Sequence, residues 1–290
     1  MGLLRSAFAV AACLLLSSST LFAGKTASCT FQTFSAPSGY TLSTVQGIGD
    51  DGTVVGQLLD NKTQMFVGFL RSPGGAVTPY AAPKSSTTWM YGQNSTGSST
   101  GSYLDNGNTP HVHGFFLAGN NFTQVDYPKA TSTWLFDVNQ LGAAVGSYSK
   151  NSSVNGFLLV NNKYTTIAYP NYQVTYPMAV NDNNAVVGSY ANGFVNNGFL
   201  WQNGKFTTIN HPNAKYGTIL TGINDAGLIV GNRLSADNEF GFIYQNGAFK
   251  NIVYSGAKLT IAGGINNNGV ISGQIYLTGT NTIGYTATCK

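Results

Sequence analysis

Charged side chains are scarce in this sequence, at 8% of 290 residues, and only ten residues are acidic. The formal net charge is +4, and the lysines and arginines are spread along the chain without forming a basic block. Because nucleic-acid-binding proteins concentrate positive charge in a patch, we expect no nucleic-acid partner. The polar residues are instead Asn, Ser, Thr and Gly. The 36 glycines and 12% aromatic residues are typical of a β-protein with many turns.

Long apolar runs are absent beyond the first residues of the sequence. The stretch 7–16 is apolar but too short to span a bilayer, and it lies between Arg5 and the polar run 17–20. We predict a secretory signal peptide over residues 1–23 and no membrane span in the mature chain. The expected location is secreted or extracellular, with the periplasm or the cell surface as alternatives. Cys13 has the spacing of a lipoprotein signal, which leaves lipid anchoring as a second interpretation.

Cysteine is rare as well, with three residues in the whole sequence. Cys13 falls within the predicted signal peptide, and Cys29 and Cys289 remain near the two ends of the mature chain. In an exported protein an isolated pair of cysteines indicates a disulfide rather than a metal site. We predict a Cys29–Cys289 disulfide, no metal ion and no cofactor.

One short motif recurs through the chain and is clearest at 223–231, which reads I-N-D-A-G-L-I-V-G. Each copy consists of a strand, a turn rich in Asn and Asp, a second strand, a third strand that begins with Gly-Phe or Gly-Tyr, and a fourth strand after a hairpin. No segment repeats its apolar residues every 3.6 positions, so we predict almost no helix. The glycines that end the copies are spaced by 45, 45, 42, 43 and 42 residues: Gly56, Gly101, Gly146, Gly188, Gly231 and Gly273.

Four antiparallel strands repeated every 42–45 residues are the signature of a β-propeller blade. We predict an all-β fold, a single six-bladed β-propeller over residues 24–290 with four antiparallel strands per blade. A closed ring buries both faces of every blade, whereas an open solenoid needs polar end caps that this sequence lacks. The predicted blades are residues 40–83, 84–128, 129–170, 171–213, 214–256, and 257–290 together with 30–37.

The two ends of the mature chain indicate how the ring closes. The sixth repeat ends without a fourth strand, and the segment 31–37 precedes the first repeat. This segment, F-Q-T-F-S-A-P, aligns without gaps on the fourth-strand segment 206–212, F-T-T-I-N-H-P. We predict that the N-terminal strand completes the sixth blade. In this register Cys29 and Cys289 occupy hairpin positions, and their disulfide contributes about 5 kcal/mol in the chain-entropy model.

The I-N-D-x-G-x-I-V-G-x-Y, G-F-L and F-T-T-I-x-x-P patterns resemble the HAF repeat of extracellular bacterial proteins. The resemblance covers essentially the whole mature chain. It is strongest at 181–214 and 224–249, and weakest at 94–101, where Ser and Thr replace the apolar second strand. The resemblance implies export and a repeat architecture, and it carries no catalytic motif.

Catalytic and metal-binding patterns are weak in this sequence. The Asn-Asp turns have too few carboxylates for calcium loops, since Glu239 is the only glutamate. Asp137 lies in a first strand, where the other repeats have Gly or Ala, and we expect it to face a water-filled channel. His111 and His113 lie on one strand face near Asp105, which makes a metal site conceivable, although an ordinary loop is the simpler interpretation.

The connections from fourth to first strands carry lysines and tyrosines, and antiparallel order places them on one face of the ring. The first strands then begin with Ser43, Thr88, Thr133, Thr175, Thr218 and Thr260, which we expect to form a ring of hydroxyls at the channel mouth. The next residue is aromatic in three consecutive repeats. Such residues suit a neutral or weakly anionic glycan, and the alternative is that they only pack between blades. The candidate binding residues are Trp89, Trp134, Tyr176, Lys84, Lys129, Lys215, Tyr127 and Tyr169.

These patterns favour an exported, non-enzymatic binding or interaction module whose partner is carbohydrate or another surface protein. Glycan binding through one face of the propeller is the specific expectation. The alternative is a secreted polysaccharide hydrolase or lyase, with Asp137 and the His111–His113 pair at the channel mouth. A structural surface protein without a specific ligand is the third option. The sequence carries no signal for an oligomeric state.

Overall fold

The structure is a computed structural model that describes residues 25–193, 195–235, 239–277 and 282–290. These residues form strands and turns without a helix, so the prediction of an all-β chain is confirmed. The predicted signal peptide, residues 1–23, lies outside the described residues. Within them, the structure contains no helix with the length and apolar character needed to cross a membrane.

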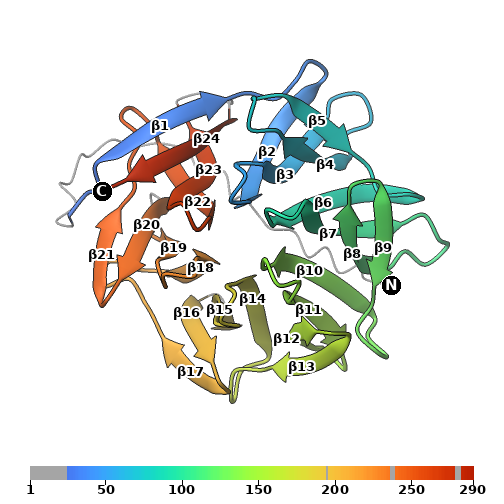
Figure 1. The fold of residues 1–290 in the computed structure, drawn as a ribbon. Coiled ribbons are helices and arrows are strands. Elements are labelled where there is room, and N and C mark those ends of the chain that lie inside the picture. Colours follow the sequence, from blue (N-terminus) through green and yellow to red (C-terminus); the bar gives the residue numbers. More distant parts are fainter. Residues whose placement is uncertain (1–24, 194, 236–238, 278–281) are drawn as a thin grey trace.

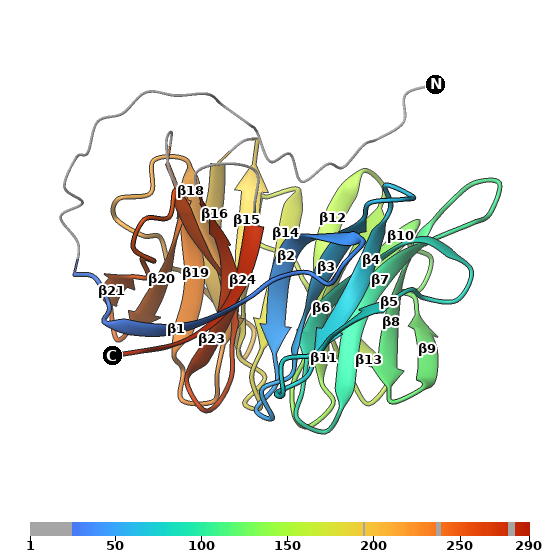
Figure 2. The same ribbon diagram turned by 90° about the horizontal axis from the view of Figure 1, so that it is seen from above.

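The strands hydrogen-bond in antiparallel groups of four that surround a central axis (Figure 1), and they run between two opposite faces of the ring (Figure 2). The first three groups are β2 (Tyr40–Ile48), β3 (Val54–Asp60), β4 (Phe66–Arg71) and β5 (Val77–Tyr80); β6 (Ser85–Gln93), β7 (Ser98–Asp105), β8 (Val112–Ala118) and β9 (Asn121–Val125); β10 (Ser132–Val138), β11 (Ala144–Lys150), β12 (Ser153–Val160) and β13 (Lys163–Ile167). The others are β14 (Val174–Val180), β15 (Val186–Asn192), β16 (Val195–Gln202) and β17 (Lys205–Thr208); β18 (Gly217–Ile223), β19 (Ile229–Leu234), β20 (Glu239–Gln245) and β21 (Ala248–Asn251); β22 (Leu259–Ile265), β23 (Val270–Tyr276) and β24 (Thr282–Cys289) with β1 (Cys29–Phe34).

Some neighbouring groups also touch through a single parallel pair, such as Asn196 with Gly217 between β16 and β18. Such pairs connect 16 strands into one sheet, while β2–β5 and β6–β9 each form a separate four-stranded sheet. In each group the first strand is innermost and the last lies at the rim (Figure 1). Antiparallel sheets packed face to face around an axis make this fold a β-propeller.

Each group buries an aromatic ring of its third strand against a glycine of its second strand. Phe157 lies opposite Gly146, and a Cβ atom on Gly146 would come within 2.6 Å of the Phe157 ring and 2.0 Å of the Trp134 carbonyl oxygen. No larger residue fits there, which explains why the copies of the motif end in glycine. The six aromatic residues at this position are all 0% exposed: Phe69, Phe115, Phe157, Phe199, Phe242 and Tyr285.

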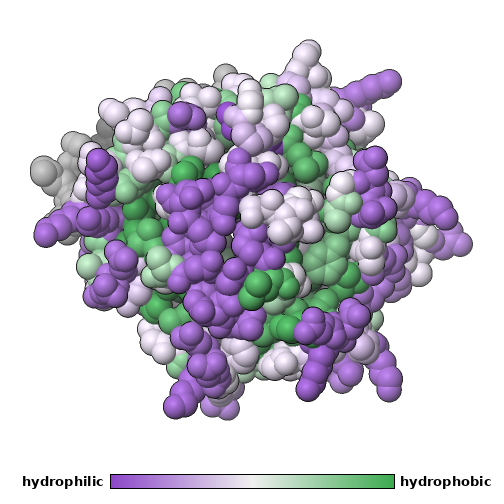
Figure 3. Space-filling view, viewed as in Figure 1, coloured by the Kyte–Doolittle hydropathy of each residue, from purple (hydrophilic) through white to green (hydrophobic). Residues whose placement is uncertain are grey.

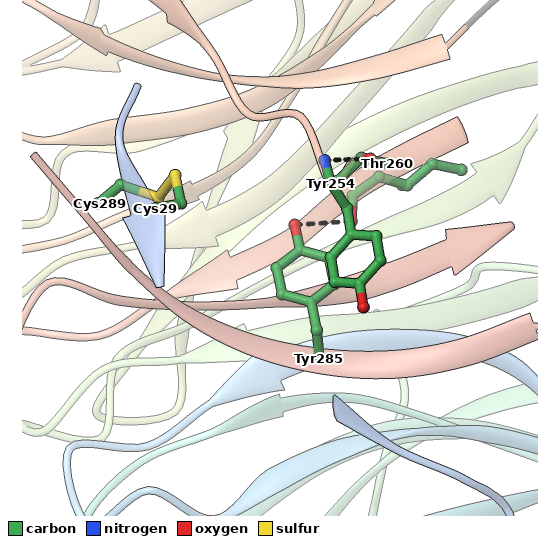
Figure 4. The surroundings of a disulfide bond; sticks show 6 residues. Cys29, Tyr254, Thr260, Tyr285 and Cys289 are labelled. Carbon is green, nitrogen blue, oxygen red and sulfur yellow. Dashed lines mark hydrogen bonds between the residues drawn. A yellow bond between two sulfur atoms is a disulfide. The ribbon is translucent and has the colours of Figure 1, made fainter. Parts of the chain in front are cut away.

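The N-terminal strand β1 pairs with the C-terminal strand β24, as the alignment of the chain ends predicted. Cys29 lies opposite Cys289, and the predicted disulfide between them is present across a sequence separation of 260 residues (Figure 4). Phe31 of β1 packs edge-on against Tyr254 and Tyr285, with ring centroids 5.2 Å and 5.1 Å away. Strand pairing, a disulfide and aromatic packing therefore hold the two chain ends together.

A buried asparagine in the turn between first and second strands makes two kinds of hydrogen bond. The Oδ1 of Asn181 accepts the backbone N–H groups of Asn183 at 3.1 Å and Ala185 at 2.9 Å, which closes its own turn. Its Nδ2 donates to the backbone carbonyl of Asn224, the equivalent residue of the next group, at 3.1 Å. The same link between groups recurs at 2.9–3.2 Å from Asn94 to Asn139, from Asn139 to Asn181 and from Asn224 to Asn266.

This amide ladder continues across the two ends of the chain. Asn266 Nδ2 donates to the carbonyl of Gly49 at 2.9 Å, and the backbone N–H of Asn267 donates to Asp50 Oδ1 at 2.7 Å. The group β22–β24 is thereby tied to the group β2–β5. Gly49 has no side-chain amide that could donate to Asn94, so the ladder is interrupted between the groups β2–β5 and β6–β9. There the carbonyl of Asn94 accepts a hydrogen bond from the side chain of Gln93 at 2.8 Å instead.

We predict that Asn181→Ala lowers the free energy of unfolding by about 2–4 kcal/mol, because it removes three hydrogen bonds and leaves buried backbone groups unpaired. Asn183→Ala, in the exposed part of the same turn, is the matched control and should change stability by less than about 0.5 kcal/mol. Urea unfolding followed by circular dichroism measures both. Equal midpoints for the two variants would contradict a stabilising role of the ladder.

Candidate functional site

The two faces of the ring differ in what they leave exposed. One face carries the Asn-Asp turns; the other, here the connection face, carries the connections from fourth to first and from second to third strands. Figure 3 shows the Asn-Asp turn face, on which hydrophilic residues gather around the centre. Among the described residues, Leu141 is an exposed large apolar side chain on the Asn-Asp turn face. The other five lie on the connection face: Met65, Phe66, Val195, Tyr216 and Val253.

Two of these apolar residues lie beside a lysine. Val195 is 50% exposed and Tyr216 is 46% exposed, and the parallel pairing of Asn196 with Gly217 places them side by side. The Lys215 ammonium lies 5.8 Å from the centre of the Tyr216 ring. Lys215 is itself exposed, so the predicted binding residue is available at a point where apolar surface and positive charge meet.

The predicted lysines Lys84 and Lys129 occupy left-handed turn positions. Their φ angles are 57° and 63°, and each follows a proline in a turn closed by a hydrogen bond, such as Ala130 N–H to the Tyr127 carbonyl at 3.1 Å. These are features of type II turns, which favour Gly or Asn at this position. Three of the four other connections have Gly or Asn in this conformation, namely Gly39, Asn171 and Gly256; in the fourth, Asn213 does not have a positive φ. Lys84 and Lys129 are exposed. Both therefore adopt a backbone conformation for which the turn itself favours Gly or Asn.

The predicted ring of hydroxyls at the channel mouth is wrong. The threonines are buried, and their hydroxyl oxygens accept backbone N–H groups from the preceding connection. Thr133 Oγ1 accepts from Tyr127, and Thr175 Oγ1 from Tyr169, both at 2.9 Å. Thr88, Thr218 and Thr260 make the equivalent bonds. These hydroxyls fix the connections to the innermost strands and are not presented to a ligand.

The predicted binding residues Tyr127 and Tyr169 also stabilise the connections. Tyr127 stacks on Tyr148 with ring centroids 3.6 Å apart, and Tyr169 stacks on Tyr190 at 3.5 Å. The Tyr169 hydroxyl lies 2.9 Å from the hydroxyl of Thr208. Both residues are half-buried, so one face of each ring is covered by protein and the remaining surface is limited.

Trp89, Trp134 and Tyr176 lie at equivalent positions of the innermost strands β6, β10 and β14, and all are half-buried. Tyr176 packs edge-on against Phe136 with centroids 6.4 Å apart, and burial raises its pKa. The structure thus brings the three predicted aromatic residues to successive groups beside the axis. Each ring has a packed part and an exposed part. Contact with a glycan and packing between neighbouring groups therefore both fit these three residues.

Asp137 lines a cavity of about 40 Å³ on the axis of the ring. Its position beside the axis agrees with the sequence prediction. The cavity has room for a few water molecules, each needing roughly 10–15 Å³, and not for a sugar ring. The Asp137 carboxylate accepts the backbone N–H of Val180 at 3.0 Å. Burial raises the pKa of Asp137 to about 7, although hydrogen bonds from the Val180 and Val138 backbones lower it. Asp137 is the one carboxylate in the lining of this cavity.

His111 and His113 do not converge on one point. His113 Nε2 lies 3.1 Å from Asp105, its Nδ1 lies 2.9 Å from Asp126, and His111 Nδ1 lies 3.0 Å from the carbonyl of Thr131. Partial burial lowers the pKa of His113, but the hydrogen bonds to Asp126 and Asp105 outweigh burial and raise it overall. The described residues contain no group of three His, Cys, Asp or Glu side chains suited to a metal ion.

No protein-family model matches the sequence, and no curated protein matches it. Among solved structures, a streptogramin B lyase aligns over 90% of this chain and 98% of its own, with 14% identity and a TM-score of 0.50. The lectin of Aleuria aurantia, described as a six-bladed β-propeller with a fucose recognition mode, aligns over 86% of this chain and 91% of its own, with 12% identity and a TM-score of 0.51.

A third similar structure is the β-propeller domain of the trilobed protease from Pyrococcus furiosus. It aligns over 86% of this chain and 97% of its own, with 9% identity and a TM-score of 0.51. At these identities the likenesses show the fold alone, and they agree on a β-propeller.

We predict that Lys129→Gly raises the free energy of unfolding by about 0.5–1 kcal/mol, because glycine adopts the left-handed conformation without strain. Lys215→Gly is the control: Lys215 is exposed on the same face and its φ angle is not positive, so this change should bring no gain. Thermal unfolding of the two variants measures the difference. A loss of stability in Lys129→Gly would contradict the assigned strain.

We predict that Asp137→Asn removes a pH-dependent loss of stability. Because the folded-state pKa of Asp137 is raised to about 7, the folded protein binds this proton more tightly than the unfolded chain, and the free energy of unfolding falls as pH rises from about 4 to 7. The variant keeps an acceptor for the Val180 N–H and should exceed the wild type by about 1–3 kcal/mol at pH 8, with equality near pH 4. Urea unfolding across this pH range tests it. A difference that does not vary with pH would contradict it.

Proposed function

We propose that this chain is an exported, non-enzymatic glycan-binding module whose connection face contacts the ligand. In this proposal the propeller has six blades and is closed by its N-terminal strand, and the chain is a HAF-repeat protein. The observation that carries the proposal is the combination of exposed apolar side chains and exposed lysines on the connection face. Aromatic and aliphatic surface accepts the C–H faces of sugars, and lysines donate hydrogen bonds to hydroxyl or weakly anionic groups.

The placement of the carboxylates supports a binding role over catalysis. A glycosidase of the usual kind needs two carboxylates across a cleft. The axial cavity is lined by one carboxylate, Asp137, and His113 is already paired with two others. The lectin among the similar structures is consistent with a propeller that binds carbohydrate, although that likeness by itself concerns the fold.

The disulfide supports a location outside the cytosol, because such bonds persist in oxidising compartments. Export itself follows from the predicted signal peptide at residues 1–23. In this proposal the amide ladder and the joined chain ends hold the ring together while the connection face contacts the ligand.

The test is a glycan array with the mature protein, followed by titration of the strongest ligand with variants of the aromatic residues beside the axis. Trp89→Ile and Trp134→Ile introduce the residue that two other repeats have at this position, Ile219 and Ile261. We expect each variant to weaken binding about tenfold and to fold normally. Ile219→Val is the control and should bind as the wild type does.

Two results would overturn the proposed function. One is an array on which the mature protein binds no glycan. The other is release of a product from any polysaccharide by the wild type but not by Asp137→Asn, because that result would favour the hydrolase or lyase. Binding to another surface protein with an empty glycan array would keep the interaction module and reject carbohydrate as its ligand.

A further inference from the structure

A hollow opens at the boundary between the group β10–β13 and the group β14–β17. It is lined by Tyr169, Pro170, Asn171, Tyr172, Gly204 and Phe206, and its volume is about 790 Å³. The hollow is shallow and largely open to solvent, so a ligand bound there would be covered on one side. The lining combines the connection before β14 with Gly204 of the hairpin between β16 and β17 and with Phe206, which pairs with Trp201 of β16.

The aromatic residues around the hollow hold one another in place. Tyr172 lies edge-on to Tyr169, with centroids 5.3 Å apart, and edge-on to Tyr190 at 4.6 Å. Tyr169 also contacts Phe206 at 4.8 Å. Three ring contacts therefore fix the wall before any ligand arrives, and a pre-formed wall lowers the entropy lost on binding.

Tyr172 is not required by its turn. Its backbone N–H closes the turn by donating to the Tyr169 carbonyl at 3.2 Å, and Ala130, Ala214 and Ala257 make the same hydrogen bond in other repeats. An alanine therefore suffices for the turn at this position. Among the described residues, the Tyr172 hydroxyl has no hydrogen-bond partner. The tyrosine adds an aromatic ring and a hydroxyl beyond what the turn needs.

The lining of the hollow carries no charged side chain. At the left-handed turn position, where the two preceding connections along the chain have Lys84 and Lys129, this connection has Asn171 with a φ angle of 66°. The Asn171 amide is exposed and offers two donors and one acceptor. Aromatic surface bordered by neutral hydrogen-bonding groups matches a pyranose, which has an apolar C–H face and hydroxyls at its edge, and leaves a charged ligand without a counter-charge.

We propose that this hollow binds a single neutral sugar ring of a glycan, with Tyr172 as the aromatic contact and Asn171 as the hydrogen-bonding partner. The assignment rests on the proposed glycan-binding function and gives it a defined subsite. In this assignment Lys84 and Lys129 contact neighbouring parts of a longer glycan, while the sugar in the hollow is uncharged.

The experiment titrates the mature protein with methyl glycosides of neutral hexoses and deoxyhexoses, and with a methyl glycoside of a uronic acid. Saturation-transfer NMR and calorimetry report binding. We expect a neutral glycoside to bind, the uronic acid to bind at least tenfold more weakly, and Tyr172→Ala to weaken the neutral ligand at least tenfold. The variant should keep the circular dichroism spectrum of the wild type, with a lower thermal midpoint because its ring contacts with Tyr169 and Tyr190 are lost. Tyr40→Ala is the matched control, because Tyr40 occupies the same turn position in the first repeat.

The outcomes separate the subsite from the proposed function. If Tyr172→Ala binds array glycans and neutral glycosides as the wild type does, while Trp89→Ile loses them, the subsite is wrong and the proposed function stands. Preference for the uronic acid also overturns the subsite. If Tyr172→Ala loses the ligand and Trp89→Ile keeps it, the subsite is supported and the contact beside the axis is rejected. An empty array together with no bound glycoside overturns both.

Discussion

The side-chain amide of the turn asparagine is the interaction on which the rest of the ring depends. A buried primary amide has two donors and an acceptor with two lone pairs, and leaving them unpaired costs about 1–3 kcal/mol each. Asn181 satisfies its acceptor within its own turn and one donor on the next group. Since the receiving carbonyl belongs to the equivalent residue of the next group, neighbouring groups meet at the same height along the axis at every boundary except the one between β2–β5 and β6–β9. Links between equivalent positions of successive repeats therefore arrange the groups as a regular ring.

Much of the fold could be predicted from the sequence because it follows from short segments. The Asn-Asp turns, the Gly-Phe third strands and the alignment of 31–37 on 206–212 are local patterns, and they led to the strand order and to the Cys29–Cys289 disulfide. The links between groups could not be predicted in the same way. The Asn181 amide could equally have pointed to water, and only the position of a residue 43 positions further along the chain decides that it does not.

The candidate site was harder to predict because a bulge changes which side chains face the axis. In β10 the pairing register shifts between Leu135 and Asp137, so Phe136 is inserted and both Phe136 and Asp137 line the axial cavity. Strict alternation along the strand would put only one of them there. Thr133, counted as a channel-mouth hydroxyl, lies before this bulge on the side that packs against the connection. The position of Trp134 was predictable, whereas the fraction of its ring that packs depends on neighbours distant in sequence.

The distribution of satisfied polar groups differs between the two faces and favours the connection face in the proposed function. On the Asn-Asp turn face the carboxylates are already engaged: Asp182 Oδ1 accepts the backbone N–H of Gln140 at 2.9 Å, and Asp225 Oδ1 accepts that of Asp182 at 2.8 Å. A ligand or cation there would have to break hydrogen bonds that hold the groups together. On the connection face the residues that differ between repeats, such as Lys129 and Tyr172, exceed what their turns require. Because the regular positions are used by the fold, the proposed function assigns selectivity for a ligand to the positions that vary.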